Sequence, residues 1–207
     1  MFKKWSKTPA FIKKIVYKWV WDIPKADKKI FLTFDDGPIP DVTEWVLDVL
    51  KEEKINATFF CIGANIEKHQ AIFERIKKEG HQTGNHTWNH LNGWNTKTAT
   101  YIENIQLVAK YLPEQKLFRP PYGKLTLNQG YKIRKLGYKI IMWDVLSYDF
   151  DPKTSPEECL NYVISASTNG SIIVFHDSLK AAENMKFALP KVIKHFKKKG
   201  YSFGILH

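Results

Sequence analysis

The sequence predicts an α/β fold built on a parallel sheet, arranged either as an open doubly wound sheet or as a slightly short barrel. Apolar runs bounded by turn residues alternate about seven times with segments of helical periodicity, which is the pattern of strand–helix–strand units. The 207 residues suffice for one domain with a sizeable core, and 43% of them are apolar. No Gly-rich phosphate-binding fingerprint follows a predicted strand, so dinucleotide and P-loop nucleotide binding are not supported.

Each predicted strand is an apolar run between turns, and these runs cover residues 30–34, 57–62, 81–85, 116–119, 138–145, 171–175 and 201–206. The predicted helices cover residues 41–53, 65–79, 98–112, 126–136, 155–167 and 184–199. The first helix shows the period most clearly, because one stripe contains Val42, Trp45, Val46 and Val49. Several helices end in Lys or Arg shortly before a glycine, as helix C-termini commonly do; these glycines are Gly80, Gly137 and Gly200.

The basic N-terminal segment, residues 1–29, is predicted to lead into a single domain at residues 30–207. It begins like a signal peptide, but lysines interrupt its apolar part at Lys13, Lys14 and Lys18. No stretch approaches the roughly 18 apolar residues of a membrane-spanning helix. A basic amphipathic helix that touches a membrane surface is the alternative to a simple lead-in. We therefore expect a cytoplasmic location or one peripheral to a membrane.

The composition is basic, with 32 Lys and Arg against 21 Asp and Glu and a net charge of +11. Such a charge favours nucleic acid, anionic lipid or an acidic glycan as a partner. The lysines are scattered and no nucleic-acid-binding motif is present, so nucleic acid is not an expected partner. The two cysteines suggest no disulfide framework, and Cys61 in ATFFCIG is expected to be a buried small hydrophobic residue.

Polar residues gather directly after the predicted strands. They lie in the segments DD at 35–36, GNHTWNH at 84–90, RPPYG at 119–123, WDVLSYDF at 143–150 and FHD at 175–177. In a parallel α/β fold these strand ends share one face, which is where active sites are built. Five segments that are distant in the sequence are therefore expected to converge on one site.

A metal site is predicted at this face. His86 and His90 are four residues apart, a spacing that makes them neighbours on a helical turn, and the pair Asp35–Asp36 follows another strand. Two imidazoles and one carboxylate form a three-ligand set that suits Zn²⁺ with an open position for water. One aspartate of the pair can then ligate the metal while the other accepts a proton from the bound water.

The segments TFDDG, HTWNH, RPPYG, WDVLSYDF and IVFH occur in the order found in polysaccharide deacetylases of the NodB-homology type, carbohydrate esterase family 4. The chain resembles this family over roughly Ile30 to Leu206. The resemblance implies a distorted, TIM-like (β/α) barrel of parallel strands and metal-dependent removal of N-acetyl groups from N-acetylglucosamine polymers such as chitin oligosaccharides or peptidoglycan. It makes Zn²⁺ the expected metal, with Co²⁺ or Ni²⁺ as alternatives. A few relatives remove O-acetyl groups from xylan.

The resemblance also implies a role for each matching residue near the metal. It makes Asp36, His86 and His90 the metal ligands. Asp35 would be the general base, and Arg119 would pair with Asp35 and orient it.

Two further roles concern the tetrahedral intermediate and the leaving group. The backbone N–H of Tyr122 would help to stabilise the oxyanion. His176 resembles the general acid that protonates the leaving amine, and Asp149 is its expected partner, raising the pKa of the imidazole. Asp144 is the alternative partner.

The sequence departs from the family pattern at two places. Phe150 follows Asp149 where a tryptophan is usual, and Val174 stands where a leucine is usual, which would widen the pocket for the acetyl methyl group. Substrate contacts are further expected from Pro121, Trp94 and Tyr148, with Trp94 lining a sugar groove. His81 is expected to be structural and Asp177 to anchor a turn.

Two other functions remain open for the same residues. One is hydrolysis of a non-sugar amide on the same fold. The other is a catalytically silent glycan-binding module, whose expected signature would be loss of the base or of a metal ligand, and the sequence shows neither loss.

Overall fold

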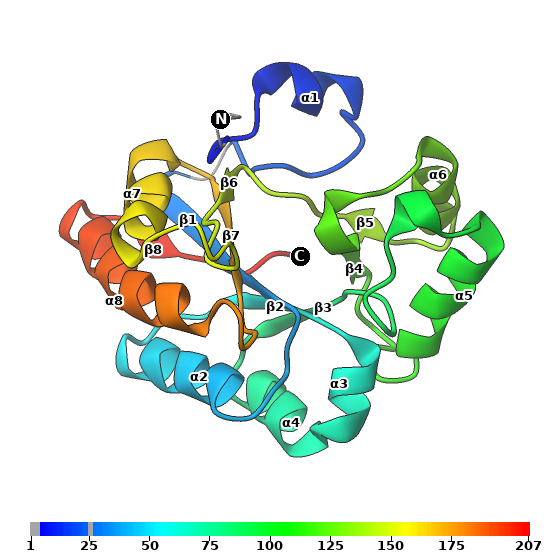
Figure 1. The fold of residues 1–207 in the computed structure, drawn as a ribbon, viewed down its shortest axis with the longest axis horizontal. Helices are drawn as coiled ribbons and strands as arrows, with labels where there is room; N and C mark the ends of the chain where they lie inside the picture. Colours follow the sequence, from blue (N-terminus) through cyan, green and yellow to red (C-terminus); the bar gives the residue numbers. More distant parts are fainter. Residues whose placement is uncertain (1–4, 25–26) are drawn as a thin grey trace.

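The computed structural model describes residues 5–24 and 27–207, and its strands form one curved, parallel sheet surrounded by helices (Figure 1). The strands are β1 Lys29–Asp35, β2 Thr58–Cys61, β3 Gln82–Asn85, β4 Leu117–Phe118, β5 Lys139–Ile140, β6 Val145–Leu146, β7 Ile172–His176 and β8 Ser202–Phe203. Their order is β5-β4-β3-β2-β1-β7-β6, with β8 paired to β1. The sheet curls rather than opening flat, which confirms the distorted (β/α) barrel.

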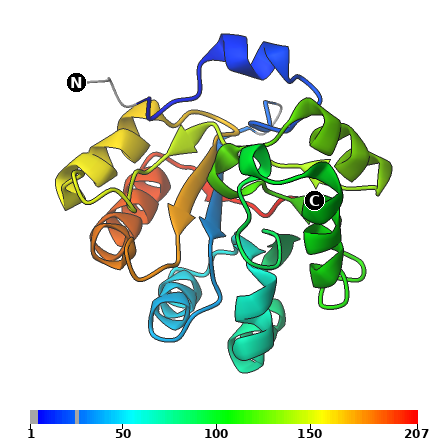
Figure 2. The same ribbon diagram turned by 45° about the vertical axis from the view of Figure 1, so that its right-hand side comes forward.

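The helices cover the outside of this curled sheet (Figures 1 and 2). They are α1 Ala10–Ile15, α2 Val42–Glu52, α3 Gly63–Lys68, α4 Gln70–Lys78, α5 Thr98–Val108, α6 Leu127–Lys135, α7 Pro156–Ala166 and α8 Ala182–Lys198, with short 3-10 turns η1 Gly93–Asn95 and η2 Pro121–Gly123. Helices α2, α6 and α7 begin with capping boxes, in which the side chains at the N-cap and three residues later satisfy the first free N–H groups.

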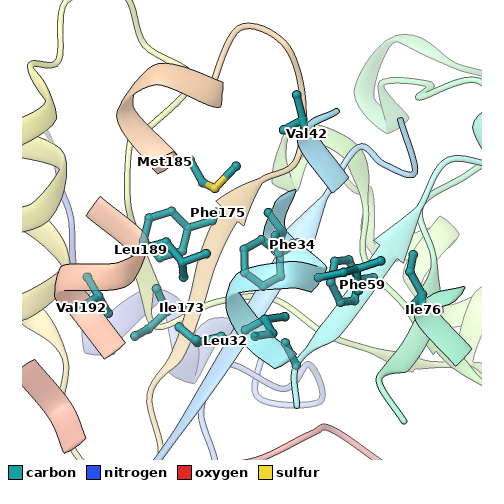
Figure 3. Packing of buried hydrophobic residues seen from close by; sticks show 14 of the residues in the cluster. Leu32, Phe34, Val42, Phe59, Ile76, Ile173, Phe175, Met185, Leu189 and Val192 are labelled. Carbon is teal, nitrogen blue, oxygen red and sulfur yellow. The ribbon is translucent and has the colours of Figure 1, made fainter. Parts of the chain in front are cut away.

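The main core lies between the central strands and the helices α2, α4, α7 and α8 (Figure 3). Every residue of β1 from Ile30 onward is buried, because the strand is covered on both faces. The ring of Phe34 stacks between Phe59 on β2, at 5.0 Å, and Phe175 on β7, at 6.2 Å between ring centroids. Each such buried side chain contributes about 1.5–3 kcal/mol of transfer free energy. This packing makes β1, which carries the aspartate pair, the rigid centre of the molecule.

The strand register brings the predicted site residues to one level. Asp35 at the end of β1 pairs with His176 at the end of β7. Asn85 at the end of β3 pairs with Phe118 at the end of β4, so that the next residues along each chain, His86 and Arg119, leave the sheet side by side. The parallel register therefore accounts for the convergence that the sequence predicts.

The prediction of one strand over residues 138–145 was wrong. The segment forms two short strands, β5 and β6, which lie at opposite edges of the sheet. The N-terminal segment fills the gap between them: Val20 donates its N–H to Ile140 and accepts from Met142, while Leu146 donates to Ser6. A local apolar run cannot distinguish one strand from two, because strand partners are distant in the sequence.

The prediction of one helix over residues 65–79 was also wrong, because α3 ends and α4 begins around His69, whose φ of −128° and ψ of 50° are not helical. In α2, the fully buried face is shifted by one position from the predicted stripe. Val42 and Val46 are buried with Leu47 and Leu50, whereas Trp45 and Val49 are only partly buried. The remaining predicted strands and helices match the observed elements to within a few residues.

The N-terminal segment packs against the barrel through one face. Ile12, Val16 and Trp19 contact a second core cluster formed mainly by α5, α6, β4 and β5. None of the residues of α1 is fully buried, and the helix lies outside the ring of the other helices (Figure 2). Within the described residues no helix has the length and apolar character needed to cross a membrane.

Candidate active site

A cavity of about 170 Å³ opens at the carboxyl ends of the strands. Its walls are formed by Asp35, Asp36, His86, His90, Pro120, Tyr122, Trp143, Leu146, Phe150, Val174, His176 and Lys180. Most of the candidate residues from the sequence therefore meet here, and two more, Arg119 and Asp149, are buried directly behind the wall. The combination of an apolar lining with a few convergent polar groups is typical of a small-molecule or catalytic site.

Asp35 is buried at the end of β1 and is held by Arg119. The guanidinium Nη1 of Arg119 donates to Oδ1 of Asp35 at 2.7 Å and to the hydroxyl of Thr33 at 2.7 Å. A single hydrogen bond to one carboxylate oxygen fixes the orientation of the group. The second oxygen of Asp35 is therefore available to accept a proton at the cavity.

Arg119 is itself completely buried and is fixed by more than the aspartate. It donates to the backbone carbonyls of Ile141, at 3.3 Å, and Met142, at 2.9 Å, and its guanidinium lies 4.1 Å from the centre of the Phe60 ring. Burial lowers the pKa of Arg119, and the neighbouring carboxylate of Asp35 opposes that effect. A buried guanidinium is tolerated when it is paired and hydrogen-bonded in this way.

Asp36, His86 and His90 present one ligand atom each to a common point, and these atoms all lie within 4.8 Å of one another. Oδ1 of Asp36 is 3.1 Å from Nε2 of His90 and 3.8 Å from Nε2 of His86. Asp36 and His90 reach this arrangement with positive φ angles of 88° and 59°, in the left-handed region that costs a non-glycine residue free energy.

The tautomer of His86 is set by its backbone neighbour. Nδ1 of His86 lies 2.8 Å from the carbonyl oxygen of Arg119, which can only accept, so Nδ1 carries the proton and Nε2 keeps its lone pair. Burial lowers the pKa of His86 to about 4, so the ring is neutral at physiological pH. Both features leave Nε2 ready to bind a cation.

His90 has an equivalent arrangement through a side chain. Its Nδ1 lies 3.1 Å from the hydroxyl of Tyr122, and the two rings are 4.5 Å apart. When Nδ1 donates to this hydroxyl, Nε2 faces Asp36 with a free lone pair. Tyr122 lies in η2 with a φ of 59° and lines the cavity, and its ring lies beside that of His90.

The three side chains fit a divalent cation. Burial opposes the ionisation of Asp36, but the contact with His90 and the charge of the protonated His176 outweigh it and hold the pKa of the carboxyl well below its usual value. Oδ1 of Asp36 is buried and makes no well-aligned hydrogen bond within the described residues. A buried anionic oxygen of this kind, facing two imidazole lone pairs, is the donor set that Zn²⁺ and similar cations prefer.

His176 and Asp149 form the second polar pair of the site. Oδ1 of Asp149 is 2.7 Å from Nδ1 of His176, and Oδ2 accepts the backbone N–H of the same residue at 2.7 Å. Burial by itself lowers the pKa of His176, but the carboxylate of Asp149 outweighs it and raises the pKa to about 9. The imidazole is therefore protonated at neutral pH and can donate a proton from Nε2.

The alternative pairing of His176 with Asp144 was wrong. Asp144 is buried elsewhere, where it accepts hydrogen bonds from Lys7, Lys13 and Ser171. Asp177, which follows His176, holds the turn after the aspartate pair. It accepts from the N–H of Gly37 at 3.0 Å and from the hydroxyl of Thr43 at 2.6 Å, and burial raises its pKa to about 8.

The substrate contacts expected from the sequence are only partly at the cavity. Val174 lines it, whereas Pro121, Trp94 and Tyr148 are not among the lining residues. Phe150, which departs from the family pattern, also lines the cavity. Trp94 is exposed in η1, and its Nε1 donates to the carbonyl of Leu125.

Four lining residues were not singled out from the sequence: Pro120, Trp143, Leu146 and Lys180. Pro120 lies in the RPPYG segment, and Trp143 and Leu146 lie in the same WDVLSYDF segment as Asp149, so membership of a segment at a predicted strand end was the available signal. Lys180 carried no signal, because its approach to the Phe150 ring, 5.6 Å from the centroid, depends on how the loop after β7 folds.

Comparison with known proteins agrees with this geometry. A family model described as polysaccharide deacetylase matches residues 22–141. A peptidoglycan-N-acetylglucosamine deacetylase of Bacillus cereus is 35% identical over 191 residues, which cover 88% of this chain and 88% of the relative. Chitin deacetylase 2 of Saccharomyces cerevisiae is 34% identical over 178 residues, covering 80% of this chain and 55% of the yeast protein.

Solved structures show the same fold. A peptidoglycan N-acetylglucosamine deacetylase superposes with a TM-score of 0.88 at 33% identity, covering 96% of this chain and 95% of the other. A family 4 carbohydrate esterase from Streptomyces lividans, in complex with acetate, superposes with a TM-score of 0.79 at 26% identity, covering 88% of this chain and 94% of the esterase. By sequence and by fold, this chain belongs to the polysaccharide deacetylases of the NodB type, carbohydrate esterase family 4.

Proposed function

We propose that this protein is a metal-dependent hydrolase that removes N-acetyl groups from N-acetylglucosamine-containing glycans. One observation supports the proposal above the others: the ligand atoms of Asp36, His86 and His90 converge within 4.8 Å in a cavity that also exposes Asp35 and His176. The relatives named for peptidoglycan and chitin deacetylation support the N-acetylated glycan as the substrate class.

Asp36, His86 and His90 would hold the cation. A divalent cation, with Zn²⁺ the expected choice and Co²⁺ or Ni²⁺ the alternatives, supplies Lewis acidity that makes a water molecule easier to deprotonate and polarises the amide carbonyl. The contribution of the chain is to fix both histidine tautomers, through the carbonyl of Arg119 and the hydroxyl of Tyr122.

The remaining groups would move protons and stabilise charge. Asp35, oriented by Arg119, accepts a proton from the attacking water as the C–O bond forms. The backbone N–H of Tyr122 stabilises the oxyanion. His176, protonated because of Asp149, donates its Nε2 proton to the leaving nitrogen as the C–N bond breaks, which releases acetate and the free amino sugar.

The test is an acetate-release assay on chito-oligosaccharides, peptidoglycan fragments and acetylated xylan, with and without a chelator. We expect release from at least one N-acetylated glycan, loss of release after chelation and recovery on adding Zn²⁺. Asp35→Asn should lower kcat by about 10²–10⁴-fold, because the general base is lost while the fold is kept. Full activity in Asp35→Asn or in the metal-stripped protein would rule out this mechanism.

The same panel, extended by a small cyclic amide, a formamide and a calorimetric measurement of glycan binding, distinguishes the other functions. Release from xylan alone would indicate an O-acetyl esterase, a possibility supported by a 31% identical relative of known structure from a multidomain xylanase. Hydrolysis of a small cyclic amide or formamide without action on any glycan would indicate a non-sugar amidase. Glycan binding measured by calorimetry without acetate release would indicate a silent binding module.

A further inference from the structure

The N-terminal segment carries an unusual concentration of exposed apolar side chains. Eleven large hydrophobic residues are exposed in the described part of the chain, and four of them lie within residues 5–17. These four are Trp5, 54% exposed, Phe11, 57%, Ile15, 72%, and Tyr17, 72%. Trp5 and Phe11 contact each other edge to face, with ring centroids 6.3 Å apart. Exposed apolar clusters of this kind mark interaction surfaces.

These apolar side chains are not the ones through which the segment packs against the barrel. The inner side of the segment is already occupied, because Ile12, Val16 and Trp19 pack against the second core cluster. Phe11 and Ile15 are one helical turn apart in α1, and neither contributes to that cluster. The segment therefore carries apolar side chains that the packing of the fold does not use.

The charge of the segment complements an anionic partner. Residues 5–21 contain four lysines and no acidic residue. Lys7 and Lys13 both pair with the buried Asp144, and Lys13 also pairs with Asp22, whereas Lys14 and Lys18 are exposed and have no ion-pair partner within the described residues. Lys14 is exposed in α1 together with Phe11 and Ile15, and Lys18 lies over the Tyr17 ring at 5.6 Å. Exposed apolar and cationic side chains are therefore interspersed along the segment.

We propose that the α1 surface, formed by Trp5, Phe11, Lys14, Ile15, Tyr17 and Lys18, docks the protein onto an anionic phospholipid bilayer. Lysines near such a surface each gain about 1 kcal/mol from the negative potential, and aromatic and aliphatic side chains beside them enter the headgroup boundary. A soluble polyanion would satisfy the lysines and leave the four apolar side chains in water, so the bilayer fits the surface better.

The position of the surface is compatible with catalysis. Figures 1 and 2 both show α1 at the periphery, outside the ring of helices α2–α8, and none of the residues of the α1 surface lines the cavity. Docking would therefore leave the candidate active site unobstructed by α1 itself. Tyr148 connects the two regions, since its hydroxyl donates to the carbonyl of Trp5 and its ring contacts Phe150 at the cavity wall.

The test is sedimentation of the full chain with vesicles of phosphatidylcholine alone and of phosphatidylcholine with one third phosphatidylglycerol. We expect binding to the anionic vesicles only. Lys14→Glu with Lys18→Glu should weaken that binding by at least about thirtyfold. Ile15→Ser should weaken it by about five- to tenfold, because an aliphatic side chain no longer enters the boundary.

Matched variants separate the surface from the overall charge. Lys68→Glu with Lys78→Glu makes the same change in net charge on α3 and α4, on the opposite side of the molecule (Figure 1), and Leu107→Ser removes an exposed aliphatic residue from α5. Both should leave binding within about threefold of the wild type. Equal losses from both charge reversals would show attraction by net charge alone and overturn the proposal.

Three other outcomes would also overturn the proposal. They are absence of binding, equal binding to both kinds of vesicle, and binding to anionic vesicles that Ile15→Ser does not weaken. The third outcome would indicate a site for polyanions in general. Acetate release from a soluble chito-oligosaccharide should be unchanged in the α1-surface variants. Failure of docking and failure of the proposed enzymatic function are therefore separate results.

Discussion

At the scale of single residues, the site depends on neighbours that set the protonation of each imidazole. His86 is buried and His176 is partly buried at the same cavity, yet their pKa values move in opposite directions, to about 4 and about 9. The difference lies in the partner of Nδ1, which is a neutral carbonyl for His86 and the carboxylate of Asp149 for His176. The first ring can therefore bind a cation, and the second can donate a proton.

Replacing Asp149 by Asn should shift the alkaline side of the pH profile. With the carboxylate present, His176 stays protonated up to a pH of about 9, so activity that needs the acid is lost as the pH rises through that value. Asp149→Asn removes the charge that raises this pKa, and the alkaline limb of kcat/KM should move toward the ordinary histidine value of about 6.5. Asp144→Asn is the comparison, since Asp144 does not contact His176, and an unmoved limb in Asp149→Asn would contradict the assigned pair.

Replacing His86 by Ala should abolish tight metal binding. Two remaining ligands hold a divalent cation far more weakly than three, and we expect affinity to fall by at least about 10–100-fold. Metal content after dialysis and titration with Co²⁺ would measure this loss. His195→Ala, on α8 and away from the cavity, should retain the metal, so equal metal content in the two variants would count against the site.

At the scale of elements, the turn between β1 and α2 is stabilised by the buried carboxyl group of Asp177, which lies outside the turn, as well as by the residues of the turn itself. Asp177, which follows β7, accepts from Gly37 in the turn and from Thr43 in α2, and Thr43 in turn accepts the N–H of Ile39. A Cβ added at Gly37 would come within 1.9 Å of the Asp177 carboxylate, so only glycine permits this approach. The position of Asp36 thus depends on three elements.

Thr43→Val should destabilise the protein by about 1–3 kcal/mol. Valine has a similar volume but no hydroxyl, so a buried oxygen of Asp177 and the N–H of Ile39 both lose their hydrogen-bond partner. Activity should also fall, since the turn that carries Asp36 loosens. Urea denaturation and kinetics measure the two effects. Thr43→Ser keeps the hydroxyl and should lie close to the wild type in both measurements.

At the scale of the whole molecule, the barrel is closed by a segment that precedes its first strand. The N-terminal segment bridges β5 and β6 with backbone hydrogen bonds, and Lys7 and Lys13 reach Asp144 from it. Burial opposes the ionisation of Asp144, but hydrogen bonds from Lys13, Ser171 and Lys7 outweigh it and lower its pKa. The same segment closes the fold with one side and presents the α1 surface with the other.

Lys13→Met should lower the free energy of unfolding by about 1–2 kcal/mol near neutral pH, because the buried Asp144 loses a charged hydrogen-bond donor. The native pKa of Asp144 lies below its unfolded value, so this stabilisation is present above a pH of about 4 and disappears as the pH falls through the native pKa. Lys14→Met makes the same change in net charge at an exposed neighbour and should have little effect. Denaturation curves for both variants at neutral and acidic pH would test the difference.

The sequence by itself determined the alternation of strands and helices and the gathering of polar residues after the strands. Both follow from local periodicity and from the rule that parallel strands end on one face. It also indicated the candidate metal ligands by the spacing of His86 and His90 and the adjacency of Asp35 and Asp36, although residues 86–90 form a loop and not the helical turn that the spacing suggested.

The tertiary structure alone decided what depends on distant partners. Three features involve contacts between residues far apart in the chain: the division of residues 138–145 between two edges of the sheet, the closing of the gap by the N-terminal segment, and the approach of Lys180 to the cavity. No local pattern encodes such contacts, since a strand or a charged side chain has the same sequence signature whichever partner it finds.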